Sequence, residues 1–266
     1  MPHPPGLITL LTDFGNRDSF VASMKGVILS INPHATIVDL SHDVLPYSIE
    51  DAAYLLKSCY RYFPEGTVHV AIVDPGVGTK RRPLGIKTSR CYFLGPDNGL
   101  FSYIFDEENE VEVREIENQQ IRLNSVGHTF EGRDIFAPAA AWLTSGQSFE
   151  SLGRRIGEGR IFPIVKPRKE ASGLVGVVIY VDHFGNLISN LTLKDVDAVR
   201  SEVSSEGLAL QIAGHRVNGL FASYAEGSKI GPSALINSNG VVEVFIKEGN
   251  AALWLKVGCG AEIILS

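Results

Sequence analysis

The first half of the chain alternates short apolar runs with segments whose apolar residues recur at helical spacing. Compact apolar runs predict buried strands at residues 7–11, 36–40 and 67–73. Apolar residues three and four positions apart predict helices at residues 19–31, 48–60 and 137–144. Strands that alternate with helices predict an α/β domain, a mostly parallel sheet with helices on both faces.

The pattern changes in the last hundred or so residues. Gly157 to Lys169 contains two prolines, two glycines and several charges, and is the best candidate for a linker. Beyond it, short strands separated by Gly, Asn and Ser are predicted at residues 174–181, 208–212, 240–246, 252–257 and 262–265. Several short strands with turn signals favour a small β-barrel or sandwich. We therefore expect two domains, residues 1–160 and 170–266.

The composition excludes some classes of protein. The 266 residues are 44% hydrophobic and 20% charged, with a formal net charge of −6. The basic clusters, Lys80 to Arg82 and Lys166 to Lys169, are too short to follow a nucleic-acid backbone. The longest apolar stretch, residues 173–181, is too short to span a bilayer, and the N-terminus lacks the basic region of a secretory signal. We expect a cytoplasmic protein that binds neither nucleic acid nor membrane.

Three cysteines, Cys59, Cys91 and Cys259, lie far apart and show no CxxC spacing. This pattern argues against a disulfide framework and against a structural zinc site. We expect all three to be reduced residues of the core.

Two aspartates directly follow predicted strands. Asp13 ends the first apolar run and Asp74 ends the third. Ligands of parallel sheets collect at the carboxyl ends of the strands, so both carboxylates could face one crevice. The alternative for Asp13 is a helix cap or turn, and for Asp74 it is a tight turn at Pro75-Gly76.

The loop after Asp74, Gly76-Val-Gly-Thr-Lys-Arg81, matches neither a Walker A loop nor a GxGxxG motif. It does bring a guanidinium about seven residues from Asp74 across a glycine turn. Either Arg81 or Arg82 could face that carboxylate, and we expect the other to be a solvated surface charge.

Histidines stand in three polar segments. His128 lies in a glycine-flanked loop ahead of a helix, which favours a functional role over a core position. His42 and His183 are near aspartates, as metal ligands often are, yet no HExxH or similar pair accompanies them. We predict no metal site.

Five segments in order resemble one family. They are Thr12-Asp-Phe-Gly15, Asp74-Pro-Gly-Val-Gly-Thr-Lys-Arg81, Gly95-Pro-Asp-Asn-Gly99, His128-Thr-Phe-Glu-Gly132 and Asp182-His-Phe-Gly-Asn186. Together they resemble the S-adenosyl-L-methionine (SAM) hydrolases, also called SAM hydroxide adenosyltransferases, which are related to SAM-dependent fluorinase and chlorinase. Each segment alone is weakly specific, but five in order are a strong signal.

The resemblance implies a fold, an assembly and a reaction. The expected fold is an N-terminal α/β domain followed by a C-terminal β-barrel. The expected assembly is a homotrimer, with SAM bound between one subunit's N-terminal domain and its neighbour's C-terminal domain. Water or hydroxide would attack the ribose C5′ and release adenosine and methionine, with SAM as substrate and no cofactor.

By the same resemblance, Asp74, Arg81 and His128 are the catalytic residues. Methionine already leaves readily from a sulfonium, so the difficulty is holding water in line with the C5′–S bond. His128 or Asp74 would accept a proton from this water, and Arg81 would stabilise developing hydroxide character. Which of them takes the proton is open at this point.

The resemblance also implies residues that bind the substrate. Asp13 would accept hydrogen bonds from the ribose hydroxyls, and Tyr47 would pack against the ribose. The remaining assignments are Ser19 and Asp182 for the ammonium group, Ser238 for the carboxylate, Phe221 and Asn186 for the adenine ring and its edge, and the backbone of Asn250 and Ala251 for the rest of the adenine site.

Two positions depart from the halogenating relatives. Asn239 stands where we expect those enzymes to have arginine, and the charged Asp74 would repel a halide ion. Hydrolysis is therefore favoured over halogenation. Two further hypotheses are a non-catalytic SAM or adenosine sensor and a metal-dependent phosphatase or nucleotidase.

Overall fold

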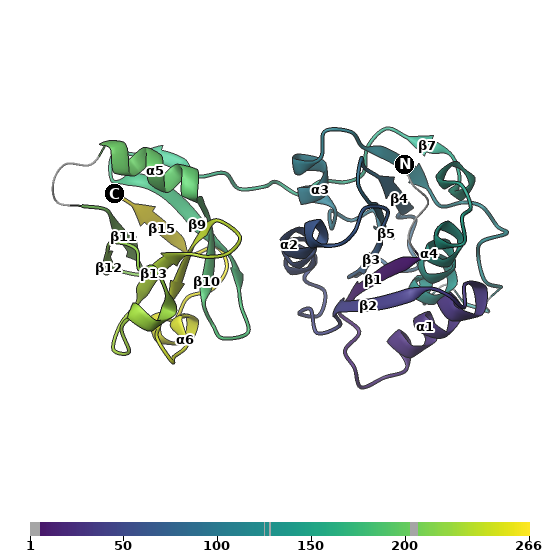
Figure 1. Cartoon of the computed structure of the whole chain (residues 1–266), viewed down its shortest axis with the longest axis horizontal. Coiled ribbons are helices and arrows are strands. Elements are labelled where there is room, and N and C mark those ends of the chain that lie inside the picture. The colour runs from purple at the N-terminus through teal and green to yellow at the C-terminus, as the bar shows by residue number, and fades with distance from the viewer. Residues whose placement is uncertain (1–5, 125, 128, 203–206) are drawn as a thin grey trace. The chain divides into compact units, whose positions relative to one another are not determined.

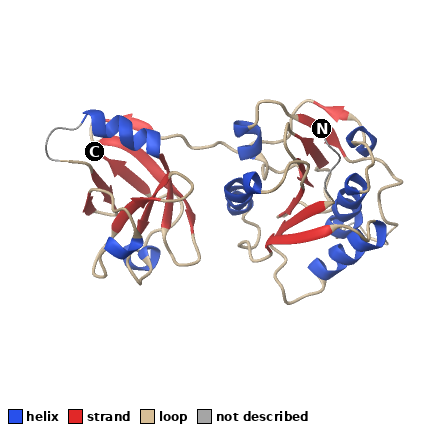
Figure 2. Cartoon of the chain, in the orientation of Figure 1, coloured by secondary structure: helices blue, strands red, loops and turns tan. Residues whose placement is uncertain are grey.

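The chain folds as two units, Met1–Pro163 and Ile164–Ser266, in a computed structural model (Figure 1). The structure describes residues 6–124, 126–127, 129–202 and 207–266. The first unit is a sheet covered by helices, and the second is built mainly of strands (Figure 2).

The sheet of the N-terminal unit has seven strands in the order β2-β1-β3-β5-β4-β6-β7. Its parallel part consists of β1 (Leu7–Thr12), β2 (Thr36–Ser41), β3 (Val68–Ile72) and β5 (Tyr92–Pro96). Its antiparallel part consists of β4 (Pro83–Lys87), β6 (Glu112–Glu115) and β7 (Arg155–Ile156). The sheet is therefore mixed, and the predicted parallel strands are one side of it.

Helices cover both faces of this sheet, which confirms the predicted fold class. Its helices and turns are α1 (Phe20–Ile31), α2 (Ile49–Cys59), η1 (Tyr60–Tyr62), α3 (Ser102–Glu107), the π-helical turn η2 (Gly132–Phe136), α4 (Ala137–Thr144) and η3 (Phe149–Leu152). Side chains of β3 alternate between the faces, as a strand requires. Val70 packs in the cluster with α1 and α4, whereas Ala71 packs in the cluster with α2 and α3.

The C-terminal unit is an antiparallel sheet in the order β12-β11-β15-β9-β10-β14-β13, with β8 added beside β9. Its strands are β8 (Arg168–Glu170), β9 (Gly173–Val181), β10 (Leu187–Thr192), β11 (Ala209–Ile212), β12 (His215–Asn218), β13 (Ser233–Ile236), β14 (Val241–Phe245) and β15 (Glu262–Leu265). The sheet curls into a nearly closed barrel around a single cluster of apolar side chains. The barrel, rather than a sandwich, is the form that the fold takes.

Two helices and a 3₁₀ turn accompany these strands: α5 (Leu193–Glu202), η4 (Tyr224–Glu226) and α6 (Ala251–Leu255). The strand predicted at residues 252–257 is wrong, because most of this segment is α6. Asn250 explains the difference: its side chain accepts a hydrogen bond from the backbone N–H of Leu253 at 2.8 Å and so caps the helix.

The cysteine prediction is only partly correct. Cys91 is buried and Cys59 is half-buried, but Cys259 is exposed in the turn before β15. Burial raises the pKa of the Cys59 and Cys91 thiols to about 11. Among the described residues, no helix is long and apolar enough to cross a membrane.

Candidate active site

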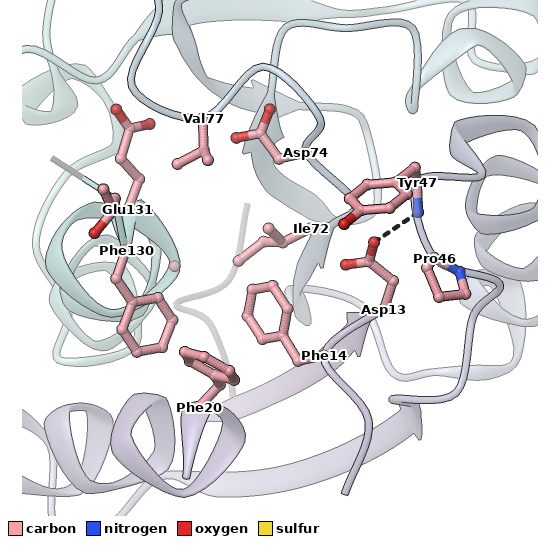
Figure 3. Close-up of a pocket in the computed structure, with 12 residues that line it drawn as sticks. Asp13, Phe14, Phe20, Pro46, Tyr47, Ile72, Asp74, Val77, Phe130 and Glu131 are labelled. Atoms are coloured by element: carbon pink, nitrogen blue, oxygen red, sulfur yellow. Dashed lines mark hydrogen bonds between the residues drawn. The ribbon is translucent and has the colours of Figure 1, made fainter. Parts of the chain in front are cut away.

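Strands β1 and β3 end together and bring two aspartates to one edge of the sheet. Thr12 and Ile72 are register partners at the ends of these parallel strands. Asp13 and Asp74 follow closely and both line a pocket of about 300 Å³ (Figure 3). The expectation that the two carboxylates face one crevice agrees with this geometry.

Asp74 is held by Arg81. Its two carboxylate oxygens accept hydrogen bonds from Arg81 Nε at 2.9 and 2.8 Å, and Oδ2 also contacts Nη2. Both side chains are only 5% exposed. The Asp74 carboxylate also accepts the backbone N–H of Gly76, and its carbonyl accepts that of Val77, so the tight-turn alternative and the ion pair coexist.

Arg82 is not a solvated surface charge, contrary to our expectation for the second arginine. Its guanidinium donates to the buried Asp97 through Nε at 2.8 Å and Nη2 at 2.6 Å. Asn98, the next residue, donates to the carbonyl of Val73 at 2.8 Å, directly before Asp74. The Gly95–Gly99 segment therefore supports both ends of the loop from Asp74 to Arg82.

Asp13 anchors the segment at Tyr47. Its Oδ2 accepts the backbone N–H of Tyr47 at 2.9 Å (Figure 3). Tyr47 has a φ of 68°, which is uncommon for a residue with a side chain and indicates local strain. The contact keeps the exposed Tyr47 ring at the pocket beside Asp13.

Three phenylalanines form the apolar wall of the pocket. The rings of Phe14, Phe20 and Phe130 lie 5.3 to 5.8 Å apart, between centroids, in tilted or edge-to-face arrangements. Figure 3 shows these rings on one side of the pocket and the carboxylates of Asp13 and Asp74 on the other. Such a site suits a ligand with both an apolar part and a charged or hydroxylated part.

Glu131 is a pocket residue that the sequence analysis did not single out. Its Oε2 contacts Nη2 of Arg81, and its side chain is 16% exposed. His128, predicted to be catalytic, lies outside the described residues. The signal for Glu131 was present in the motif itself, as a carboxylate three residues beyond His128 and directly ahead of a helical turn.

Ser19, predicted to bind the ammonium group, occupies the N-cap position of α1. Its side chain is exposed and makes no capping hydrogen bond. The following residue, Phe20, lines the pocket, so Ser19 stands next to the lining without being part of it.

A second pocket, of about 490 Å³, lies in the C-terminal unit and contains Asp182 and Asn186. Asp182 Oδ1 accepts the backbone N–H groups of Phe184 and Asn186 at 2.9 and 2.8 Å. Its Oδ2 accepts from the Asn186 side-chain amide at 3.0 Å. This carboxylate therefore already holds its own turn together.

Tyr224 lines the same pocket and donates to Oε1 of the buried Glu243 at 2.6 Å. Burial, together with the hydrogen bond to Glu243, raises the pKa of the Tyr224 hydroxyl, which stays protonated at neutral pH. The phenol is thus a fixed donor rather than a proton acceptor.

The other predicted residues of this unit differ in their proximity to the pocket. Asn250 and Ala251 follow Gly249 of the lining, and the turn at Gly185 packs against Asn250. Phe221 is half-buried beside β13, and Ser238 is exposed in the turn between β13 and β14. Neither lines the pocket.

The two histidines that suggested metal ligands have other surroundings. His42 is buried, with Nδ1 2.9 Å from Thr12 Oγ1 and Nε2 3.0 Å from Asp39 Oδ1. His183 is exposed beside Phe184. Within the described part of the chain, no group of three or more His, Cys, Asp or Glu residues is arranged to hold a metal ion.

These features define a class of protein: an α/β domain with paired charged residues at the ends of its parallel strands, followed by a barrel with a pocket of its own. Both halves match one family. Residues 8–153 match the model of the SAM hydroxide adenosyltransferase N-terminal domain, and residues 176–264 match that of the C-terminal domain. The chain belongs to this family.

Individual relatives agree with this membership. The chain is 34% identical to an (R)-S-adenosyl-L-methionine hydrolase of Methanocaldococcus jannaschii, over 94% of this chain and 92% of the relative. It is 29% identical to a fluorinase of an Actinoplanes species, over 88% of each chain. A crystal structure of an uncharacterized conserved protein from Thermotoga maritima superposes with a TM-score of 0.89 at 32% identity, covering 97% of this chain and 99% of that one.

Proposed function

We propose that this protein hydrolyses SAM to adenosine and L-methionine by attack of water at the ribose C5′. The observation that carries the proposal is the charge of the N-terminal pocket. Three carboxylates, those of Asp13, Asp74 and Glu131, line it, and the guanidinium of Arg81 contacts two of them. The pocket therefore has an excess of negative charge.

This excess favours one substrate and one nucleophile. The sulfonium of SAM is a cation, so a negative pocket attracts it. A halide ion would be repelled by the same carboxylates, whereas neutral water would not. The charge of the pocket thus supports hydrolysis over halogenation, although fluorinases are among the relatives.

The reaction requires mainly that the protein positions the reactants and supplies charge beside them. The C5′–S bond breaks with its electron pair going to sulfur, so methionine leaves as a neutral thioether and needs no acid. Holding water in line with this bond can lower the barrier by about 7–11 kcal/mol. The rigid Asp74–Arg81 pair is suited to fix the position of such a water molecule.

The proposed substrate contacts divide between the two units, and some of them lie beside rather than in the pocket linings. Asp13 and Tyr47 would hold the ribose, and Phe14, Phe20 and Phe130 would exclude bulk water from the reacting carbon. Asn186 and the backbone at Asn250 and Ala251 would bind the adenine, and Phe221 would stack on it. Ser19, Asp182 and Ser238 would bind the methionine end.

We further propose that the protein assembles as a homotrimer whose SAM sites combine the N-terminal pocket of one subunit with the C-terminal pocket of a neighbour. Light scattering coupled to size-exclusion chromatography tests the assembly. A monomer that hydrolyses SAM at full rate would contradict it.

The activity is tested by incubating the purified, EDTA-treated protein with SAM and separating the products by liquid chromatography, with and without chloride. We expect adenosine and methionine in equal amounts, with neither chelator nor chloride changing the products. A 5′-halogenated nucleoside would indicate a halogenase. Tight binding of SAM without turnover would indicate a sensor.

A further inference from the structure

The third member of the charged cluster in the N-terminal pocket is Glu131. The guanidinium of Arg81 lies between two carboxylates, with Asp74 on one side and Glu131 on the other. The side chains of Arg81 and Asp74 are almost fully buried, and that of Glu131 is mostly buried. Glu131 is among the residues that line the pocket (Figure 3). Glu131 is thus part of one connected network rather than a solvated surface acid.

The backbone beneath Glu131 is firmly held. It immediately precedes the π-helical turn η2, and turns of this kind are frequent at functional sites. Gly132 is packed so closely that an added Cβ would lie 3.2 Å from Met24 Sδ and 3.3 Å from Ile72 Cδ1. Backbone N–H groups of Arg133 and Asp134 donate to the carbonyl of Phe130. The position of the Glu131 side chain is therefore set by the fold.

The two carboxylates beside Arg81 differ in whether an oxygen atom remains free to accept another hydrogen bond. Both oxygens of Asp74 accept hydrogen bonds from Arg81. Glu131 uses Oε2 for its contact with Arg81, and no hydrogen bond to its Oε1 occurs among the described residues. A carboxylate oxygen with open lone pairs, next to a pocket and oriented by a guanidinium, is well placed to receive a proton.

We infer that Glu131 is a catalytic residue, the group that accepts the proton of the attacking water; this inference rests on the proposed hydrolysis of SAM. The water oxygen bonds to C5′, and the C5′–S electron pair moves to sulfur and neutralises the sulfonium. One water proton passes to Glu131 Oε1, and the other stays on the new 5′-hydroxyl. Glu131 then releases its proton to solvent, which completes the balance of one proton per SAM hydrolysed.

Arg81 and Asp74 are positioning residues in this mechanism. The guanidinium orients Glu131, and Asp74 fixes the guanidinium by a two-point contact. Glu131 takes the part that the sequence left open between His128 and Asp74.

The test compares four variants with the wild type: Glu131→Gln, Glu131→Ala, Glu131→Asp and the control Glu65→Gln. Glu65 is 62% exposed and lies 4.0 Å from Arg90 Nη1, so the control makes the same change of charge away from the pocket. We expect Glu131→Gln and Glu131→Ala to lower kcat by about 10²–10⁴ with KM changed by less than about threefold. Glu131→Asp should keep more activity than Glu131→Gln, because it retains a carboxylate.

Chemical rescue of the Glu131→Ala variant distinguishes a chemical role of Glu131 from a structural one. Added formate should raise the kcat of Glu131→Ala at least about tenfold, because it supplies a carboxylate to the vacated space, and chloride at equal ionic strength should not. Failure of rescue together with a loss of SAM affinity that matches the loss of rate would overturn the inference and make Glu131 a ligand-holding group.

The remaining outcomes are also decisive. A Glu131→Gln enzyme within about fivefold of the wild-type kcat would overturn the role of Glu131 and leave the proposed hydrolysis intact. A wild-type protein that binds SAM without turnover would overturn both. If Glu131→Ala does not fold, a higher activity for Glu131→Gln than for Glu131→Asp still contradicts the inference.

Discussion

The two pockets of this chain both contain aspartates at the ends of strands, yet these aspartates have different hydrogen-bond partners and different roles. In the N-terminal pocket, Asp74 is paired with a guanidinium that also contacts Glu131. In the C-terminal pocket, Asp182 accepts N–H groups of its own turn, at Phe184 and Asn186. The first arrangement keeps charges beside the ligand space, whereas the second uses its charge to shape a loop.

The difference assigns separate tasks to the two units. A carboxylate fixed by an arginine can act on a reacting atom, because its charge is oriented and its position is rigid. A carboxylate that closes a turn mainly presents the backbone and neighbouring rings of that turn, such as the exposed Phe184. We therefore expect substitutions in the N-terminal pocket to change the rate, and those in the C-terminal pocket to change affinity and local stability.

Among the substitutions that test the difference between the two pockets, we expect Asp74→Asn to have the largest effect. An amide cannot accept from Arg81 with both of its polar atoms, so the guanidinium loses its two-point anchor. We predict a fall in kcat of about 10²–10⁴ with SAM affinity changed by less than about threefold. Steady-state kinetics and calorimetric titration measure the two quantities, and Asp197→Asn on the surface of α5 is the charge-matched control.

A smaller effect is expected from Asp13→Asn. Its carboxylate holds the Tyr47 backbone and would bind the ribose hydroxyls, and losing hydrogen bonds to a charged group costs about 1–3 kcal/mol. We predict that adenosine and SAM bind about 10–100-fold more weakly while kcat changes little. The exposed neighbour Asp18 provides the control Asp18→Asn; a fall in kcat as large as for Asp74→Asn would show that Asp13 acts on the reaction itself.

The stability of the N-terminal unit should depend on pH through His69, which is buried in this unit. Its Nδ1 lies 2.8 Å from Thr9 Oγ1, its Nε2 has no partner among the described residues, and its ring stacks on Phe93. Burial lowers the pKa of this histidine to about 3. Since an unfolded histidine has a pKa of about 6.5, the unfolded state binds the extra proton between these values.

The free energy of unfolding of this unit should therefore fall as the pH drops below about 6.5, by about 2 kcal/mol at pH 5 from His69 alone. His69→Leu should remove this part of the pH dependence, and His34→Gln, at an exposed position, should not. Chemical denaturation at several pH values measures it. An unchanged slope for His69→Leu would show that the histidine is not buried in its neutral form.

The smallest effect is expected from Asp182→Asn in the C-terminal pocket. Replacing the charged acceptor weakens three hydrogen bonds of one turn, and we predict a loss of stability of about 1 kcal/mol with kcat nearly unchanged. Ser238→Ala, on the exposed turn before β14, is the control for thermal unfolding. A loss of kcat comparable to that of Asp74→Asn would end the division of tasks proposed here.

The sequence predicts the sheet and its edge well because the central strands are continuous apolar runs. The runs at residues 7–11 and 67–73 are buried almost throughout, so the strands and the position of Asp13 and Asp74 at their ends follow from the pattern. The fold class is confirmed for the same reason.

The features that the sequence did not predict depend on specific side-chain contacts rather than on the apolar pattern. Leu253, Leu255 and Val257 alternate as in a strand, but the cap from Asn250 turns the segment into α6. Arg82 looked like a surface charge because its partner, Asp97, is fifteen residues away. Glu131 stands in a motif that the sequence analysis quoted, but its pairing with Arg81, fifty residues away, is not visible in that motif.

Turnover in oxygen-18-enriched water shows whether the N-terminal pocket directs water to the ribose C5′. Mass spectrometry of the products should find the label in the 5′-hydroxyl of adenosine and none in methionine. Unlabelled adenosine, or a nucleoside carrying another substituent at C5′, would contradict the proposed attack of water.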